Sequence, residues 1–321
     1  MIRVATMYSE ELQSRLAKVE FIRLKCALRC EQSSEVKLPE CLALRPVIVH
    51  AAQDLASMGA LDNHTFMRLF DPDFEGDTLG RKRFQKPAPP FVLRYSPGAF
   101  RTYQPGELFR FELVLMGAAL AQVSFFVRLL ELLGEQAFGN DGAFELYGVE
   151  GWDDSENLHP VWFPGDDLDD LMPPVCTADW WVMRHEPLQR PLSFDFVTPA
   201  RVMKRGKPLF RPDFKDLFPF MLRRVTALCY AHADQLLLED VQPTLASVEN
   251  TNGRCTLLWE DWRSLQGAGD LEVGGLMGHC SLNGEQLEQF AWVLALAELF
   301  QIGRGATYGA GKIEFLPPSA G

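Results

Sequence analysis

Near its end the chain reads Gln301-Ile302-Gly303-Arg304-Gly305-Ala306-Thr307-Tyr308-Gly309-Ala310-Gly311-Lys312, with an apolar helix-like run before it and a short strand-like run after it. Glycines this dense let a backbone approach a ligand closely, with N–H groups turned outward. Arg304 and Lys312 indicate an anionic ligand, most often a phosphate. A helix C-cap and a tight turn are the alternative, but a cap needs one or two glycines rather than four, so we favour a ligand loop.

The order of elements separates this loop from two known phosphate-binding motifs. A P-loop ends in Gly-Lys-Ser or Gly-Lys-Thr, and both the P-loop and the dinucleotide fingerprint place their glycines after a strand and before a helix. Here the glycines follow a helical run and precede a strand-like run, which is the reverse order.

Composition limits the class of protein. With 321 residues and 47% hydrophobic content, the chain can fill one large core or two ordinary ones. No apolar run reaches the length that spans a bilayer, and Met1–Lys18 lacks the apolar core of a signal peptide, so we expect a cytoplasmic protein with no membrane partner. The seven cysteines are scattered without zinc-knuckle spacing, which predicts buried, reduced thiols.

The net charge of −12 argues against a nucleic-acid partner until its distribution is considered. Residues 150–186 carry ten Asp and Glu side chains and one Arg, a local charge of −9 that leaves the rest of the chain at −3. A basic face elsewhere is compatible with this balance. The acidic segment has no calcium-loop spacing, so we expect it to be solvated and expect no metal or cofactor; its central acids are Asp166, Asp167, Asp169 and Asp170.

Apolar periodicity predicts the same order of elements in both halves of the chain. In the first half we expect strands at 19–29, 91–95, 108–116 and 144–149, and helices at 42–58 and 119–133, the latter capped by Gly134. Between them, 62–90 is expected to be a long polar connection. In the second half we expect strands at 192–198, 255–259, 273–281 and 312–315, and helices at 213–232, with Asp213 as its cap, and 285–300.

Each half therefore reads β-α-β-β-α-β, the ferredoxin-like arrangement. The predicted fold class is α+β, with two tandem ferredoxin-like (RRM-like) domains at 1–150 and 192–321, the second carrying the glycine-rich loop. The acidic, proline-bearing residues 151–191 are expected to be irregular and to link or cover the two domains.

Two such domains with a glycine-rich loop before the last strand resemble the RAMP superfamily of CRISPR-associated proteins, and within it the precursor-RNA-processing endoribonuclease family. The resemblance is most specific in the C-terminal block and looser before Pro89. The similar stretches are Val273–Gly278, Leu287–Phe300 and Ile302–Lys312, then Thr198–Gly206 and Arg223-Arg224, and in the first domain Pro89–Arg94 and Gly134–Gly139.

This resemblance implies binding of CRISPR repeat RNA and its metal-independent cleavage. The ribose 2′-hydroxyl attacks the adjacent phosphate and leaves a 2′,3′-cyclic phosphate and a 5′-hydroxyl. Such a step needs a base near the 2′-hydroxyl, an acid near the leaving oxygen and a cation for the phosphorane charge. Other CRISPR effector subunits are implied as further partners.

A histidine is the usual base at neutral pH, and the chain has six. Members of the family often carry a catalytic histidine in the region of His50, which follows Arg45-Pro46 on a predicted helix. His50 is therefore the first candidate base, His64 the second and His279 the third. For each of them, a packed or solvated histidine beside an apolar face is the alternative.

Relatives often carry a histidine where this chain has Gln301, whose amide can bind a phosphate or a base edge but cannot shuttle a proton. Tyr308 is a further catalytic candidate that could stack a base or donate to a phosphate, with a packed ring as the alternative. The expected RNA-binding residues are a basic run and the loop itself, namely Arg201, Lys204, Arg205, Lys207, Gly303, Arg304, Gly305, Gly309, Gly311 and Lys312.

Three functions stay open at this point. The first is an endoribonuclease that binds and cuts CRISPR repeat RNA, with His50 as its base. The second, favoured by Gln301 and by the negative charge, is a RAMP subunit that holds guide RNA in an effector complex without cutting it. The third is an acidic scaffold that contacts protein partners through residues 151–191.

Overall fold

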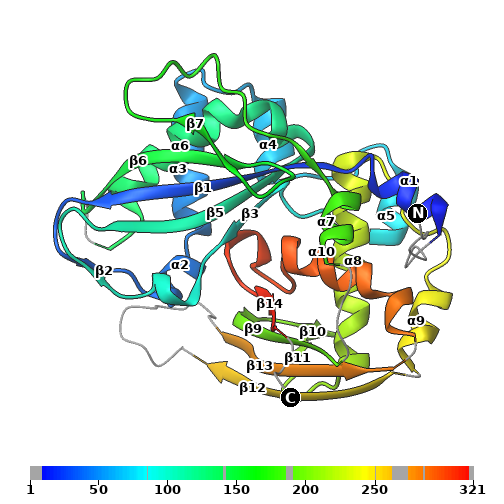
Figure 1. The fold of residues 1–321 in the computed structure, drawn as a ribbon. Coiled ribbons are helices and arrows are strands. Elements are labelled where there is room, and N and C mark those ends of the chain that lie inside the picture. Colours follow the sequence, from blue (N-terminus) through cyan, green and yellow to red (C-terminus); the bar gives the residue numbers. More distant parts are fainter. Residues whose placement is uncertain are drawn as a thin grey trace.

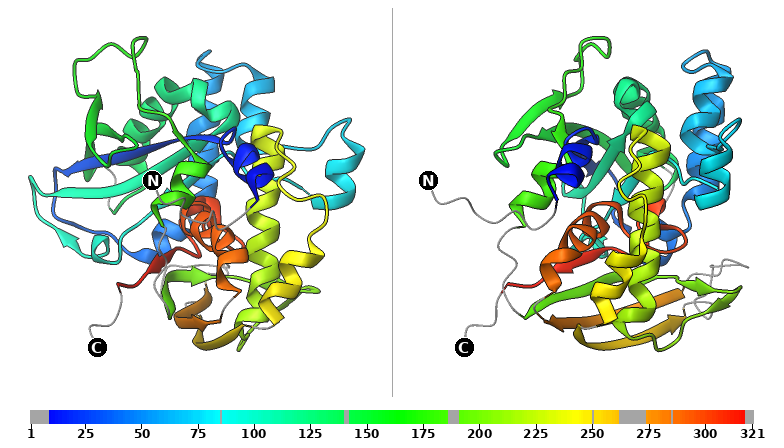
Figure 2. Two further views of the ribbon diagram at one scale, coloured as in Figure 1. Left: turned by 45° about the vertical axis from the view of Figure 1, so that its right-hand side comes forward. Right: turned by 90° about the vertical axis from the view of Figure 1, so that its right-hand side faces the viewer.

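The structure is a computed structural model that describes residues 9–84, 86–139, 142–185, 191–249, 251–261, 274–284 and 286–317. Two antiparallel sheets, one from each half of the chain, form separate layers (Figure 1). Helix α10 (Ala291–Phe300) and helix α7 (Ala178–Arg184) lie between these layers. Figure 2 shows from two further sides that the loop after α10, in red, lies where the two halves of the molecule meet.

The first sheet is built around β1 (Glu20–Cys30), whose apolar side chains are buried along nearly its whole length. β1 pairs antiparallel with β5 (Leu108–Met116) on one side and with β6 (Phe144–Trp152) on the other. β3 (Phe91–Arg94) extends the sheet beyond β5, and β7 (Leu158–Trp162) extends it beyond β6. The order β3-β5-β1-β6 is that of a ferredoxin-like domain, so the fold predicted for the first half is confirmed.

The other elements of the first half surround this sheet. Helices α3 and α6 contact each other and bury their apolar faces in the same core as β1 and β5. In chain order the elements are α1 (Glu10–Leu16), β2 (Ser34–Glu35), α2 (Leu38–Leu42), α3 (Arg45–Ser57), α4 (Asn63–Phe70), α5 (Thr78–Phe84), the 3₁₀ turn Pro97–Ala99, β4 (Thr102–Tyr103), the 3₁₀ turn Gly117–Gln122, α6 (Val123–Gln136) and β8 (Cys176–Thr177).

The second sheet repeats this topology, with the order β12-β13-β9-β14. Its strands are β9 (Leu192–Ala200), β12 (Asn252–Asp261), β13 (Gly274–Asn283) and β14 (Ile313–Phe315). The 20-residue helix α8 (Phe214–Ala233) packs on it together with α10 and begins at Asp213, whose carboxylate accepts from the N–H of Asp216, as the sequence predicted. The remaining elements are β10 (Met203–Lys204), β11 (Lys207–Pro208), α9 (Gln242–Glu249) and the 3₁₀ turns Leu287–Gln289 and Ala306–Tyr308.

Two local predictions are wrong. The connection predicted at 62–90 contains α4 and α5, because Asp62 caps α4 and its apolar side chains Phe66, Leu69 and Phe70 reach the core. Gly134 lies inside α6 rather than after it. A Cβ there would stand 3.1 Å from the carbonyl oxygen of Phe144, so the glycine serves close packing of helix on strand.

The acidic segment 151–191 is less irregular than predicted. β7 and β8 add to the first sheet, where β8 pairs with the start of β1. Helix α7 begins at a Thr177 cap and buries Trp181 against α10, with the indole N–H donating to the carbonyl of Ala295 at 2.8 Å. Apolar side chains spaced between the acids, such as Val161 and Trp162, give these elements a buried face.

Two further expectations are corrected by the structure. Cys255 and Cys280 face each other directly across β12 and β13 and form a disulfide, whereas the other five cysteines are free and buried. The run Gly117–Gln136, with mean hydropathy 1.4, is long and apolar enough to cross a membrane by composition alone. Half of it is buried here, and α6 within it contributes Phe126, Leu129 and Leu130 to the core of the first domain.

Candidate nucleic-acid groove

The glycine loop is fixed in place from both domains. The hydroxyl of Thr198 on β9 donates to the carbonyl of Gly309 at 2.7 Å and accepts from the N–H of Lys312 at 2.8 Å. From the first domain, the Leu93 carbonyl on β3 accepts from the amide Nε2 of Gln301 at 3.0 Å. The loop is therefore a tightly held connection at the domain boundary, and its shape depends on both domains.

Its glycines are explained mainly by close approach of other chain segments. Gly303 has φ +89°, and a Cβ there would stand 2.8 Å from the carbonyl oxygen of Arg201. Gly309 has φ +103°, and a Cβ there would stand 2.4 Å from the ring of Tyr95. Side chains at these positions would push the loop away from β9 and from the first domain.

Several loop side chains that the sequence proposed as ligands face the interior. Lys312 is 7% exposed, and its ammonium donates to the Tyr95 carbonyl at 2.9 Å and to Glu314 at 2.7 Å. Gln301 is fully buried, and Tyr308 is 5% exposed with its ring in the core of the first domain. The ring of Tyr308 is therefore packed, which was the alternative to a base-stacking ring in the sequence analysis. Neither Lys312 nor Gln301 presents its polar group to solvent.

Arg304, by contrast, is exposed and opens onto a groove between the two domains. The groove consists of two adjoining cavities of about 990 and about 430 Å³ that share several lining residues. Asp71 is the one acid among the described residues that line either cavity. Six cations line it, and they define what we call the basic groove: Arg45, Lys86, Arg201, Arg223, Arg224 and Arg304.

Arg201 and Arg304 form the centre of the basic groove. Their backbones pair as an isolated antiparallel bridge, with the N–H of Arg304 donating to the carbonyl of Arg201 at 2.8 Å. Residues directly opposite in such a bridge have Cβ atoms about 5 Å apart and project to the same side. Two guanidinium groups placed in this way suit phosphate oxygens, which they can bind in a bidentate manner.

Two other cations of the groove are held by neighbouring groups. Arg224 on α8 is partly buried and donates to the carbonyl of Phe300 at 3.3 Å. Burial lowers the pKa of Arg224 to about 10, so the guanidinium still carries its charge at neutral pH. Lys86 forms an ion pair with Asp71 at the rim of the groove.

Arg45, the first residue of α3, approaches the loop from the first domain. Burial raises the pKa of Tyr308, and the nearby Arg45 guanidinium opposes this shift in part. The net pKa of Tyr308 is above its ordinary value, so the phenol is a poor base at neutral pH. Arg45 and Tyr308 both line the larger cavity, where they combine a charge with a proton donor.

The predicted basic run lies beside the groove. β10 and β11 form a hairpin whose turn is Arg205-Gly206, with φ +52° and +77°, as a two-residue hairpin turn requires. Arg205 and Lys207 are exposed at this turn, while Lys204 forms an ion pair with Asp216 at 3.0 Å. Met203 of the same hairpin lines the smaller cavity, so these cations extend the basic groove outward.

None of the histidines lies among the described residues that line the basic groove. His50 on α3 is 75% exposed at its side chain, with Nε2 3.7 Å from Asp54 on the same helix. His64 is exposed in the first turn of α4. His279 lies on β13, where Nδ1 is 2.8 Å from Asp195. The structure therefore does not bring the three candidate bases together with the loop.

The remaining histidines have structural partners. His159 contacts Asp153, His185 lies between the Trp181 carbonyl and Glu298, and His232 faces the Ala88 carbonyl. Within the described part of the chain, no three His, Cys, Asp or Glu side chains are grouped so that they could hold a metal ion. The contributions of Arg45, Lys86 and Arg224 to the groove were not predicted as a set. Arg45 lies on α3, Lys86 in the connection after α5, and Arg224 on α8. Of the three, only Arg224, in the Arg223-Arg224 pair, was marked in the sequence, through the family resemblance.

Comparison with known families covers both halves of the chain. A family model described as CRISPR-associated endoribonuclease Cas6 matches residues 194–313, which include the glycine loop and Arg201. A second model, described as an N-terminal domain, matches residues 19–173. Among curated proteins none matches the chain by sequence.

Several solved structures share the fold at low sequence identity. A chain of a partial Cas6-RT-Cas1–Cas2 complex is 12% identical with a TM-score of 0.57; the match covers 94% of this chain but 47% of that longer one. A Cas6 product complex is 15% identical with a TM-score of 0.53, over 93% of this chain and all of that one. Thermus thermophilus Cas6 is 15% identical with a TM-score of 0.51, over 93% and 99%.

Proposed function

The chain belongs to the CRISPR-associated endoribonuclease Cas6 family, and from this membership we propose that it binds CRISPR repeat RNA across the basic groove. One observation carries the proposal. Although the chain has a net charge of −12, six cations and one acid line the groove between its domains. A polyanion is the ligand that this local charge selects, because each phosphate neutralised by Lys or Arg releases a counterion.

The groove supports contact with the backbone of the RNA more directly than with its bases. Arg201 and Arg304 present paired guanidinium groups at the centre, and the hairpin with Arg205 and Lys207 extends the charge outward. Such contacts position a nucleic acid, whereas base edges specify its sequence. We therefore assign the predicted loop and hairpin arginines to phosphate binding, and we assign Lys312, Gly303 and Gly309 to holding the loop that presents them.

Cleavage of the bound RNA is the second function that we propose, and membership of an endoribonuclease family favours it. In this step the 2′-hydroxyl oxygen forms a bond to phosphorus, the bond to the 5′-oxygen breaks, and a 2′,3′-cyclic phosphate and a 5′-hydroxyl result. Arg201 and Arg304 would stabilise the charge on the phosphorane. His50, exposed on the same helix as Arg45, stays the provisional base, and RNA leaving the groove past Arg45 would have to reach it.

The direct test is to incubate the purified protein, in EDTA, with a transcript of the CRISPR array of the same genome. Cyclic-phosphate products support cleavage, and loss of products in His50→Ala assigns the base. Transcript that is bound, released by salt and recovered intact supports the guide-holding subunit instead. If the transcript does not bind at low salt, both proposals fail. The transcript is a cytoplasmic molecule, and other CRISPR subunits are the partners that we propose for the complex.

A further inference from the structure

The outer face of the second sheet is not covered by any described helix. Helices α8 and α10 lie on the inner face only, as Figures 1 and 2 show, and Leu276, Cys280 and Leu282 of β13 point into that core. Because side chains alternate along a strand, the residues between them point outward. The outer face therefore carries five cross-strand pairs of β12 and β13, namely Asn252 with Asn283, Arg254 with Ser281, Thr256 with His279, Leu258 with Met277, and Glu260 with Gly275.

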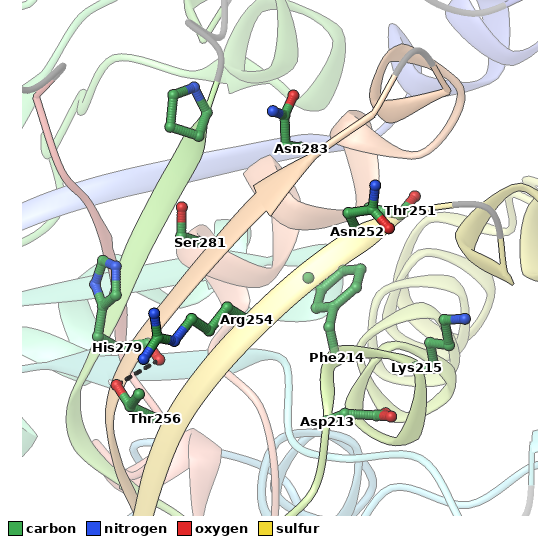
Figure 3. A pocket seen from close by; sticks show the side chains of 12 residues that line it. Asp213, Phe214, Lys215, Thr251, Asn252, Arg254, Thr256, His279, Ser281 and Asn283 are labelled. Carbon is green, nitrogen blue, oxygen red and sulfur yellow. Dashed lines mark hydrogen bonds between the residues drawn. The ribbon is translucent and has the colours of Figure 1, made fainter.

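Three of these pairs line a cavity of about 850 Å³, which lies away from the basic groove. Figure 3 shows Ser281 and Asn283 one after the other along β13, and the side chain of Arg254 extends from β12 toward Thr256 and His279. Every one of these side chains can donate a hydrogen bond. The lining of the cavity is therefore rich in hydrogen-bond donors, and it also includes the acid Asp213 and the apolar Pro191 and Phe214.

The charges around this cavity leave Arg254 available for a ligand. The carboxylate of Asp195 on β9 is 2.8 Å from Nδ1 of His279, which orients the imidazole. Arg254 is exposed and has no ion-pair partner among the described residues. Lys215 nearby is held by Glu249. Arg254 thus lies beside neutral donors and one lining acid, Asp213, whose carboxylate already accepts from the N–H of Asp216. The cation and the neutral donors suit a phosphate oxygen.

The same strands connect this cavity to the basic groove. Gly274, the first residue of β13, lines the groove, and Asn283 at the other end of β13 lines the cavity. Ten residues of strand span roughly 30 Å. Between the two sites lie Leu258, which is 67% exposed, and Met277, which offer an apolar surface against which bases can pack. Glu260, nearer the groove, is the acid among the described outward-pointing residues of β12.

We propose that the outer face of β12 and β13 is a second contact surface for single-stranded RNA, which leaves the basic groove at Gly274 and follows both strands toward Asn252 and Asn283. The inference rests on the proposed function of the groove. Sheets of this topology bind single strands on the open face by stacking bases on rings of the central strands. Here the ring of His279 lies on a central strand, with Arg254 beside it for the phosphate.

The test compares RNA probes of two lengths. Oligouridylates of about 6 and about 16 nucleotides bracket the site sizes of single-strand-binding domains, and their affinities are measured at several salt concentrations. For the long probe, Arg254→Ala is expected to flatten the slope of log K against log salt by about 0.7, the value for one lost phosphate contact on a single strand. For the short probe, which fits within the groove, the slope is expected to stay as in the wild type.

Arg110→Ala is the matched control, because Arg110 is also an exposed arginine on a β-strand but lies in the first sheet. Arg304→Ala should weaken binding of both probes. If Arg254→Ala and Arg110→Ala bind the long probe with the same affinity and slope, the second surface is ruled out while the groove proposal stands. If the wild type binds neither probe at low salt, the groove proposal fails and this one fails with it.

Discussion

The boundary between the two domains carries two clusters of arginines with opposite surroundings. The interior cluster consists of Arg94 and the two acids beside it. Arg94 is 5% exposed, and its guanidinium lies 2.7 Å from Glu112 of the same sheet and 3.9 Å from Glu298 of the second domain. In the basic groove, Arg201 and Arg304 lie side by side facing a cavity in which Asp71 is the sole acid among the described lining residues.

The acids near each cluster decide its role. Burial alone would raise the pKa values of Glu112 and Glu298. Arg94 and then Arg23 hold the pKa of Glu112 below its ordinary value, and the hydrogen bond with His185, followed by Arg94, does the same for Glu298. These carboxylates are therefore charged and compensate the buried arginines. The described residues that line the groove include six cations and a single acid, Asp71, so an external anion can balance the excess charge. The same residue type thus joins the domains in one cluster and is left to bind in the other.

The largest expected effect comes from breaking the interior cluster. Arg94→Ala removes the nearest cation of Glu112 and a more distant cation of Glu298, which keeps its contact with His185. The change should lower the free energy of unfolding by about 3–5 kcal/mol, because it leaves enclosed carboxylate charge poorly compensated. Denaturant unfolding measures this loss. Arg110→Ala, on the exposed side of β5, should change stability by no more than about 0.5 kcal/mol. A loss below about 1 kcal/mol in Arg94→Ala would mean that the two acids find other partners.

The next effect separates the two cations of one loop. Arg304→Ala removes a charge from the groove and should weaken RNA binding by about 1.5–3 kcal/mol, the range for hydrogen bonds to charged groups. Its stability should be unchanged. Lys312→Ala should do the reverse, because that ammonium is buried between Tyr95 and Glu314. Filter binding measures the RNA affinity of both variants, and thermal melts measure their stability. An equal loss of RNA affinity in both variants would contradict the difference proposed between Arg304 and Lys312.

The dependence of stability on pH also distinguishes the interior from the groove. Burial lowers the pKa of His232 to about 4, while its Nε2 donates to the Ala88 carbonyl of the first domain. The folded pKa lies below the unfolded value near 6.5, so its contribution to stability is full above about pH 6.5 and is lost as the pH falls toward 4. Between pH 7 and pH 5 this loss amounts to about 2 kcal/mol.

Unfolding at pH 7 and at pH 5 measures this component. His232→Gln, which cannot take up a proton, should lose less stability between the two pH values than the wild type does. Equal losses would show that other groups carry the acid sensitivity. RNA binding by the groove arginines should not follow the titration of His232, because guanidinium groups stay charged throughout this range.

The smallest effect concerns the one acid of the groove. Lys86 and Asp71 form a solvent-exposed pair, so Asp71→Asn should change stability by at most about 1 kcal/mol. It frees Lys86 for a phosphate, which should steepen the dependence of RNA affinity on salt by up to about 0.7 in log–log slope. An unchanged slope would place Lys86 outside the RNA path.

Much of the secondary structure was predicted because it follows from local periodicity. The strand predicted at 108–116 has these bounds in β5, and the helix predicted from the Asp213 cap is α8. The helices and strands that the sequence analysis missed share one cause. Short elements such as α4 and β7 are stabilised by contacts with a core that the local sequence does not reveal.

The candidate site was predicted in part. The loop glycines and Arg304 stood out from the sequence, and Arg304 does open onto the groove. Lys312 looked equivalent to Arg304 in the sequence, yet its ammonium is enclosed by the carbonyl of Tyr95, just after β3, and by Glu314 of β14. Arg45 and Lys86 lie more than 200 residues from the loop, and no local pattern connects them with it.

The sequence by itself determined the order of strands and helices, and with it the doubled ferredoxin-like topology, because alternation and capping are local properties of the chain. Only the tertiary structure decided which cations have acids beside them. That depends on how two separately folded halves meet, since a carboxylate far away in the chain neutralises an arginine only when packing brings the two together.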